Sequence, residues 1–345
     1  MERQLARMWY GPRRGPSLLQ PLSWVYGAVV RARSAAYGRG WLGVEPAALP
    51  VVVIGNVTVG GTGKTPLTVW LAGALRERAF RPAIVTRGYG RRETSSEPRL
   101  VRPDSRWEAV GDEPLLLSRR TGCPTVVAAD RVAAARRLAT EPVDVILSDD
   151  GLQHLRLARV CEIAVVDGMR GFGNGRLLPA GPLREPPARL DRVDLVVVNG
   201  SAEHASLGGG ALSHPVLRMR LVAGRARRVD GFGAEERPLE SFRRSRVHAV
   251  AGIGHPERFF RELEASGLEI SRHAYPDHHP FTDRDLAFAD DLPVLMTEKD
   301  AVRCGGLATE RMWYVPVAAE FDDADAQMLL QQVCRRIDAF HERTR

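Results

Sequence analysis

Cysteine is scarce in this sequence, and its spacing excludes several classes of site. The 345 residues include four cysteines, and no two of them lie closer than 30 positions apart. This excludes a CxxC zinc or redox motif and gives no indication of a disulfide framework, so a reducing, cytosolic environment fits best. With 44% hydrophobic and 26% charged residues, the composition also excludes a long disordered or fibrous chain.

Lysine is rarer still. Lys64 and Lys299 are the two lysines among 49 basic residues, so the other 47 are arginine. A general drift toward arginine explains the bias itself. We expect a lysine that remains to be needed for its chemistry, because a compact ammonium group differs from a planar guanidinium.

Positive charge is concentrated at the N-terminus. Residues 1–45 contain seven arginines and two acidic residues, a net charge of +5, whereas the whole chain carries +7. The remaining 300 residues are therefore nearly neutral. Because no basic stripe runs along the chain, we expect no nucleic-acid partner.

The N-terminal segment also lacks a run with the length of a membrane span. Residues 15–30 are 16 uncharged residues that include Gln20 and Pro21, whereas a spanning helix needs about 20 apolar ones. A signal peptide and an ordinary packed helix remain alternatives, although the nucleotide-binding motif that follows argues against export.

An interfacial helix is the interpretation that we favour for this segment. Four apolar residues are spaced by 4, 3 and 4 positions and therefore share one helical face. They are Leu18, Leu22, Val25 and Val29. Arginines flank them, as do Trp9, Trp24, Tyr26, Tyr37 and Trp41. Basic flanks and aromatic rings are typical of helices that lie in a membrane surface, so we predict such a segment at residues 1–45.

Short apolar runs alternate with helical patterns along the rest of the chain. This alternation is typical of a parallel, doubly wound α/β sheet with helices on both faces. It stops near residue 200 and restarts at residue 247, which predicts two α/β lobes. The expected parts are a first domain at 46–212, a connecting β segment at 213–246 with a hairpin of 216–222 and 226–231, and a smaller domain at 247–345 that closes over the active site.

A glycine-rich loop gives the clearest functional signal. The sequence GNVTVGGTGKTP at 55–66 follows a predicted buried strand and opens a predicted helix, as in P-loop nucleotide-binding proteins. The residues expected to bind the nucleotide are Thr58, Gly60, Gly61, Thr62, Gly63, Lys64 and Thr65. Lys64 would reach the β- and γ-phosphates and Thr65 would bind Mg²⁺. Thr58 departs from the usual pattern, which has glycine there.

A second strand supplies the acidic partner of this loop. Residues 143–151 form an apolar run that ends in Asp149 and Asp150, and either carboxylate could hold Mg²⁺ directly or through water. The sequence TEKD at 297–300 lacks the spacing of the [NT]KxD motif of guanine-specific proteins. ATP is therefore the expected nucleotide.

Several motifs together resemble the tetraacyldisaccharide 4′-kinase family, the lipid A 4′-kinases of Gram-negative bacteria. Besides the P-loop they are TRGYGR (86–91), GDEP (111–114), DDGLQH (149–154), GNGRLLPAGPLREP (173–186), DHHPF (277–281) and TEKDAVR (297–303). The resemblance spans about residues 15–305, and the family's Thr or Ser at the first Walker position accounts for Thr58. It implies ATP- and Mg²⁺-dependent phosphorylation of the 4′-hydroxyl of a tetraacyldisaccharide 1-phosphate in lipopolysaccharide biosynthesis. It also implies a place at the cytoplasmic face of the inner membrane.

The resemblance further implies roles for individual residues. It points to an Asp–His pair that activates the sugar hydroxyl, which we assign to Asp112 and His278, with Asp277 and His279 as alternatives. Other assignments follow from motif position: Glu113 near Mg²⁺, Arg184 and Arg131 for phosphate charge, and Tyr89, Arg131 and His154 on the substrate side. Lys299 receives no firm role.

Two other functions remain open from the residues alone. A P-loop ATPase switch would bind a membrane or a partner and transfer phosphate only to water, and it would not require GDEP, DDGLQH and DHHPF together. A soluble small-molecule kinase or ligase could carry the same P-loop, and it would need no detergent to stay in solution. No obligate protein partner is expected.

Overall fold

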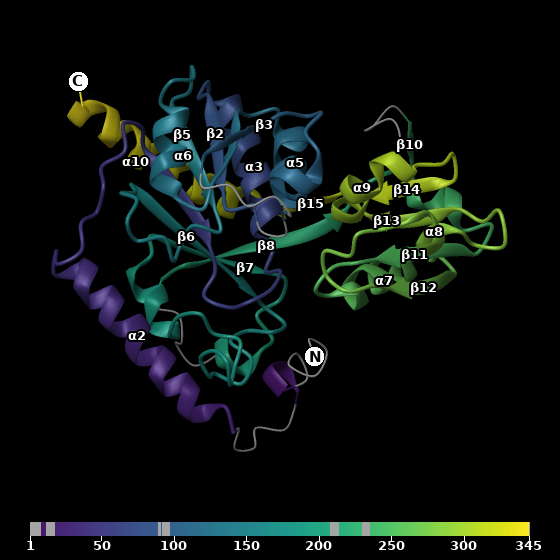
Figure 1. Cartoon of the computed structure of the whole chain (residues 1–345), viewed down its shortest axis with the longest axis horizontal. Coiled ribbons are helices and arrows are strands. Elements are labelled where there is room, and N and C mark those ends of the chain that lie inside the picture. The colour runs from purple at the N-terminus through teal and green to yellow at the C-terminus, as the bar shows by residue number, and fades with distance from the viewer. Residues whose placement is uncertain are drawn as a thin grey trace.

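The computed structural model describes residues 8–11, 18–88, 91, 97–207, 214–229 and 235–344. Two α/β lobes lie side by side, with the N-terminal helix α2 (Gln20–Gly38) along the edge of the larger one (Figure 1). Tyr89 of the TRGYGR motif lies outside the described residues.

The larger lobe is built on a nine-stranded sheet of order β15-β8-β7-β6-β1-β5-β2-β4-β3. Its strands are β1 (Val51–Gly55), β2 (Pro82–Thr86), β3 (Arg99–Val101), β4 (Thr125–Val127), β5 (Val145–Asp149), β6 (Cys161–Asp167), β7 (Leu195–Asn199), β8 (Val216–Ala223) and β15 (Val317–Phe321). The strands from β8 to β4 are parallel, and the two edge strands β15 and β3 are antiparallel to their neighbours. Strands β1 and β5 are buried along their whole length, because helices and loops cover both faces of the sheet.

Helices cover both faces of this sheet, as the alternating pattern predicts. Its helices are α3 (Lys64–Glu77), α4 (Trp107–Val110), α5 (Asp112–Thr121), α6 (Arg131–Leu138) and α10 (Asp323–Thr344). On one face, Leu67, Leu71 and Leu75 of α3 pack with Leu329 and Val333 of α10. On the other face, α6 and the loops after β5 and β6 bury a second apolar cluster.

The smaller lobe has a six-stranded sheet of order β10-β9-β14-β13-β11-β12. Its strands are β9 (Ala226–Arg228), β10 (Glu236–Arg237), β11 (Val247–Ala251), β12 (Ile270–Ala274), β13 (Val294–Thr297) and β14 (Met312–Val315). Its helices are α7 (Pro256–Ala265), α8 (Asp283–Leu286) and α9 (Glu298–Cys304). Among the described residues of the whole chain, short 3₁₀ helices lie at Pro187–Arg192, Ala205–Leu207, Leu239–Phe242 and Gly305–Leu307.

The connection between the lobes differs from the predicted hairpin of 216–222 with 226–231. β8 joins the larger sheet and β9 the smaller one, so the two do not pair with each other. The chain returns from β14 to β15 alongside this connection, where the Gly224 amide donates to the Pro316 carbonyl at 2.8 Å. The predicted limit of the second domain at residue 345 is therefore wrong, since β15 and α10 pack on the larger lobe.

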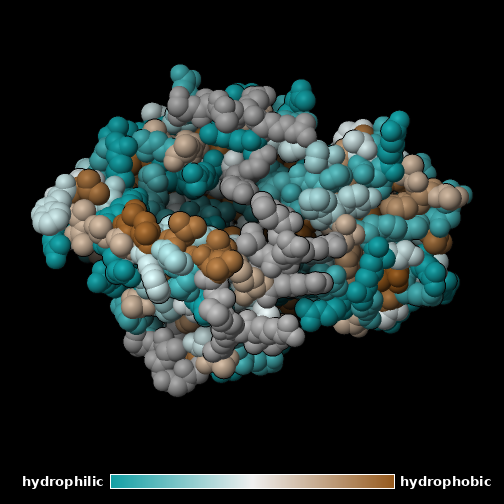
Figure 2. Space-filling view, turned by 60° about the horizontal axis from the view of Figure 1, so that its bottom comes forward, coloured by the Kyte–Doolittle hydropathy of each residue, from teal (hydrophilic) through white to brown (hydrophobic). Residues whose placement is uncertain are grey.

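Helix α2 turns its small and polar side toward the protein and its large apolar side outward. Ser23 and Gly27 are buried, and the Ser23 hydroxyl donates to the Leu177 carbonyl. Three of the four predicted face residues, Leu22, Val25 and Val29, lie in α2 and are 58% to 64% exposed. Leu18 precedes the helix and is fully exposed. Figure 2 shows hydrophobic residues gathered on the face that carries this helix. Among the described residues, no helix combines the length and the apolar character needed to cross a bilayer.

Candidate active site

The glycine-rich loop runs from the end of β1 to the start of α3, where its geometry requires glycine. Gly60 and Gly63 have φ values of 108° and 101°, a region that disfavours any residue with a Cβ. A Cβ on Gly63 would also lie 2.9 Å from the Asn199 side-chain nitrogen. That amide instead donates to the Thr62 carbonyl at 2.9 Å and holds the loop from β7. The first turn of α3 therefore presents its free backbone amides, as a phosphate site needs.

Thr58 connects this loop to the segment that carries Arg184. Thr58 is buried, and its backbone pairs with Leu183 in an isolated antiparallel bridge. The Arg184 amide donates to the Val57 carbonyl at 2.7 Å. The Arg184 guanidinium then donates to both carboxylate oxygens of Asp150, at 2.8 and 3.0 Å. Arg184 is thus fixed between the glycine-rich loop and the end of β5.

The two aspartates at the end of β5 have opposite electrostatic environments. Burial would raise the pKa of Asp150, but Lys64, whose Nζ lies 3.5 Å away, and Arg184 lower it to about 2. Burial and the nearby charge of Glu113 raise the pKa of Asp149 to about 7, although Thr68 donates to this carboxylate at 3.1 Å. Asp150 therefore lies beside two cations. Asp149 is buried near a second carboxylate, Glu113, whose own ion-pair partner is Lys299.

Two neighbouring carboxylates, one of them buried with a raised pKa, suit a bound cation. The pair Asp149 and Glu113, with the hydroxyl of Thr65 at the start of α3, offers the oxygen donors that Mg²⁺ prefers. The described residues contain no group of three His, Cys, Asp or Glu placed to form a metal cage. Mg²⁺ commonly uses one or two carboxylates together with phosphate oxygens and water, so the donors present fit that ion.

Asp112 and His278 come from different lobes and form a hydrogen-bonded pair. Asp112 begins α5 and is buried, and its carboxylate lies 2.9 Å from His278 Nδ1. Arg303 of α9 also donates to this carboxylate, at 2.7 Å. Burial would raise the pKa of Asp112, but Lys299, His278 and Arg303 lower it to about 2. Asp112 is therefore ionised at neutral pH and accepts hydrogen bonds only.

Of the alternative residues of the DHHPF motif, His279 contacts Asp285, whereas Asp277 lies beside His278, with its carboxylate 3.8 Å from His278 Nε2. His279 Nε2 lies 3.2 Å from Asp285, and its ring stacks on Tyr275. Asp277 lies 4.0 Å from the Nζ of Lys299 and accepts from the backbone amide of His278 at 3.0 Å. His278 itself has a φ of 57°, an uncommon conformation for a residue other than glycine. It is the histidine of this motif that reaches Asp112.

Helix α9 contributes Lys299 and Arg303, two residues whose roles were not predicted from the sequence. Lys299 donates to Glu113 at 3.0 Å, and the charges of Glu113, Asp112 and Asp277 raise its pKa in spite of burial. Arg303 is held in turn by Asp300, which also accepts from the Gly252 amide. The motif TEKDAVR is the sequence signal for Arg303. A motif alone does not show which strand or helix the Arg303 side chain contacts, so it predicts no role for this residue.

Two of the predicted substrate residues, Arg131 and His154, lie on the α6 side of the site. Arg131 is buried at the start of α6 and donates to the Ala128 carbonyl at 2.7 Å. Its guanidinium is close enough to interact with the charges of Asp149 and Asp150. Burial and the charge of Arg131 lower the pKa of His154 to about 4, so this histidine is neutral at pH 7.

Gln153 is a further residue of the site that sequence reasoning missed. Its side chain accepts from Arg184 at 3.3 Å and donates to Glu185 at 2.8 Å. Helix α2 reaches the same place, because the Tyr26 hydroxyl donates to the Arg184 carbonyl at 3.0 Å. The exposed apolar helix is thus in direct contact with the loop that bears Arg184.

The site as a whole can align a phosphate donor with an acceptor hydroxyl. Lys64 and Arg184 supply positive charge beside the glycine-rich loop, and Glu113 lies between Asp149 and Lys299. The imidazole of His278, polarised by an ionised carboxylate, can accept a proton. This combination fits phosphoryl transfer, which depends on alignment and charge neutralisation.

Comparisons with known proteins show the family of this chain. The family model for tetraacyldisaccharide-1-P 4′-kinase matches residues 16–335. The tetraacyldisaccharide 4′-kinase of Nitrosococcus oceani is 49% identical over 337 residues, 96% of each chain. That of Alkalilimnicola ehrlichii is 49% identical over 320 residues, 92% of each chain. A crystal structure of LpxK from Aquifex aeolicus in complex with ATP superimposes with a TM-score of 0.78 at 26% identity, covering 92% of this chain and 98% of that one. This chain belongs to the tetraacyldisaccharide-1-P 4′-kinase family.

Proposed function

We propose that this protein transfers the γ-phosphate of ATP to the 4′-hydroxyl of a tetraacyldisaccharide 1-phosphate. The observation that carries the proposal is the hydrogen bond between Asp112 and His278, which joins the two lobes beside the nucleotide loop. A switch that transfers phosphate only to water would not need such a pair.

The proposed reaction follows from the charges in the site. His278 accepts the proton of the sugar hydroxyl as its oxygen attacks the γ-phosphorus, and the bond to the β–γ bridging oxygen breaks. Asp112 stabilises the imidazolium that forms. Lys64 and Arg184 stabilise the charge on the transferring group and on ADP. Mg²⁺, held by Thr65, Asp149 and Glu113, would neutralise phosphate charge when bound.

Roles on the acceptor side are assigned by position. Arg131 is a cation near Asp149, the last residue of β5, and Asp150, which follows it. We assign Arg131 and His154 to the substrate side of the site. Tyr89 is assigned there from its motif alone. Arg131 can contact a phosphate of the lipid through its planar guanidinium.

A transfer assay tests the proposed function. We expect γ-labelled ATP, Mg²⁺ and detergent-dispersed tetraacyldisaccharide 1-phosphate to give labelled lipid, and we expect EDTA to stop the transfer. The matched acceptor control is the same lipid with its 4′-hydroxyl already phosphorylated. Hydrolysis of ATP without labelled lipid would contradict the proposal and favour the switch.

We infer that α2 seats the protein on the cytoplasmic face of the inner membrane. Its outward side is apolar, with Trp24 66% and Val25 64% exposed, and arginines flank it. Exposed apolar faces of this kind are stabilised by burial in the headgroup region of a bilayer. Because Tyr26 contacts the loop of Arg184, the helix would hold the site next to a substrate that stays in the membrane.

Charged substitutions on α2 test this inference. We expect the triple substitution Leu22→Glu, Val25→Glu and Val29→Glu to weaken co-sedimentation with phosphatidylglycerol vesicles about tenfold or more, since each residue loses apolar burial. Met328→Glu on α10 is the control, because Met328 is also an exposed hydrophobic residue, 42% exposed, but lies on another helix. Unchanged co-sedimentation of the triple variant would refute a role of α2 in membrane binding.

A further inference from the structure

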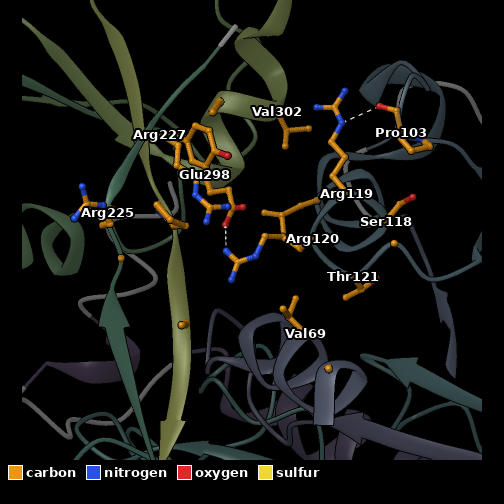
Figure 3. Close-up of a pocket in the computed structure, with 18 of the residues that line it drawn as sticks. Val69, Pro103, Ser118, Arg119, Arg120, Thr121, Arg225, Arg227, Glu298 and Val302 are labelled. Atoms are coloured by element: carbon orange, nitrogen blue, oxygen red, sulfur yellow. Dashed lines mark hydrogen bonds and ion pairs between the residues drawn. The ribbon is translucent and has the colours of Figure 1, made fainter. Parts of the chain in front are cut away.

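A cavity lies between the two lobes, near the end of α5 that is opposite to Asp112. Its volume is about 810 Å³, and residues of α3, α5, α9 and both connecting segments line it (Figure 3). Asp112 begins α5, whereas the opposite end of the same helix, from Ser118 to Gly122, forms a wall of this cavity. The connecting segments contribute Gly224 and Pro316. No part of the proposed reaction uses this cavity.

The lining carries more positive than negative charge. Five arginines and two glutamates contribute to it: Arg76, Arg119, Arg120, Arg225, Arg227, Glu236 and Glu298. Arg120 pairs with Glu298 at 2.7 Å, and Glu236 pairs with both Arg227 and Arg225, at 2.8 and 3.9 Å. Five arginines against two glutamates give the lining a net charge of +3. This charge lies in a partly enclosed space, where attraction to an anion is stronger than in bulk water.

The pair of Arg120 and Glu298 crosses the boundary between the lobes. Arg120 lies on α5 of the larger lobe and Glu298 on α9 of the smaller one, and the two side chains point toward each other in Figure 3. Both side chains are less than one-fifth exposed. Burial raises the pKa of Glu298 although Arg120 is beside it. The ionised carboxylate therefore loses more stabilisation by leaving water than the ion pair with Arg120 returns.

The same two helices carry Asp112 and the cations that hold it. Asp112 and Glu113 begin α5 and are held by Arg303 and Lys299 of α9. Lys299 follows Glu298 directly in the sequence. A ligand that changes the contact between Arg120 and Glu298 would therefore change how α9 presents Lys299 and Arg303 to the active site.

We propose that this interlobe cavity binds a soluble, phosphate-bearing anion that bridges the lobes and alters turnover. The volume is within the range of small-molecule sites. Guanidinium groups bind phosphate oxygens through two parallel hydrogen bonds, and arginines from both lobes line this cavity. No residue of α2 lines the cavity, so the ligand comes from solution and not from the bilayer that we assign to α2.

Pyrophosphate binding tests the site apart from kinase activity. Pyrophosphate is titrated into Lys64→Ala protein by isothermal titration calorimetry, without Mg²⁺ and at a fixed ionic strength. The Lys64→Ala substitution weakens binding of pyrophosphate at the nucleotide loop. We expect one site in that protein, and about tenfold or greater loss of affinity on adding Arg225→Gln and Arg227→Gln. The control adds Arg243→Gln and Arg246→Gln, two exposed arginines of the same lobe that do not line the cavity. Arg225→Gln alone replaces the double change if that variant fails to fold.

Three results would overturn the proposal. They are no binding to the Lys64→Ala protein, unchanged affinity after the Arg225 and Arg227 substitutions, and an equal loss in the control.

A second measurement tests the link to turnover. With saturating ATP and Mg²⁺ and otherwise wild-type protein, we expect inorganic phosphate to change kcat at least twofold, and the Arg225→Gln and Arg227→Gln variant to lose that response. An equal response in both proteins would place the effect at the active site and refute the coupling.

Discussion

Lys64→Ala is expected to abolish phosphate transfer while the protein stays folded. Lys64 begins α3 with its ammonium group beside Asp150, where it would neutralise the charge that develops on the transferring phosphate. Removing one such group from a preorganised site costs a factor of about 10² to 10³, and we expect the upper end here because the γ-phosphate depends on this charge. Stability should change little, since Arg184 still pairs with Asp150.

The measurement is labelled-lipid formation together with thermal unfolding of the same sample. Arg78→Ala is the matched control, because Arg78 is a basic residue at the opposite end of the same helix, where its side chain donates to the Ala74 carbonyl. We expect that control to retain full activity. Full transfer by Lys64→Ala would refute the assignment of the nucleotide loop. Lys64→Arg should recover little activity, because a planar guanidinium does not fit the place of an ammonium.

Local patterns predicted the elements that place this lysine. The buried strand, the glycine-rich turn and the helix that begins at Lys64 are close in sequence, and the structure has all three. The acidic residues at the end of β5 were also predictable, because strand β5 pairs directly with β1 in a parallel sheet. The carboxyl ends of neighbouring parallel strands lie at one edge of the sheet.

Contacts between distant segments were not predictable in the same way. A local pattern does not say that the C-terminal segments β15 and α10 return to the first lobe. Likewise Lys299 and Arg303 meet Glu113 and Asp112 across more than 180 positions. A motif shows that such residues occur together, whereas their pairing depends on how the two lobes pack.

The pairing of Asp112 with His278 did come from sequence, through the family resemblance, and its role is tested by combining two substitutions. We expect Asp112→Asn and His278→Gln each to lower kcat by a factor of about 10² to 10⁴, the usual contribution of a positioned acid or base. Asn keeps the shape of Asp112 but loses the charge that stabilises the imidazolium. Because the pKa of Asp112 is about 2, this charge is present at every pH used for the assay.

If the two residues act as one unit, the double variant is no slower than the slower single variant, because each single change already removes the unit's contribution. His279→Gln is the matched control, since this neighbouring histidine faces Asp285 and not Asp112, and its kcat should stay near wild type. Asp112→Asn leaves Arg303 paired with Asp300, so the variant should fold at the assay temperature, which thermal unfolding checks. Losses that multiply in the double variant would mean that His278 and Asp112 act independently, and a large loss in His279→Gln would move the base to the neighbouring ring.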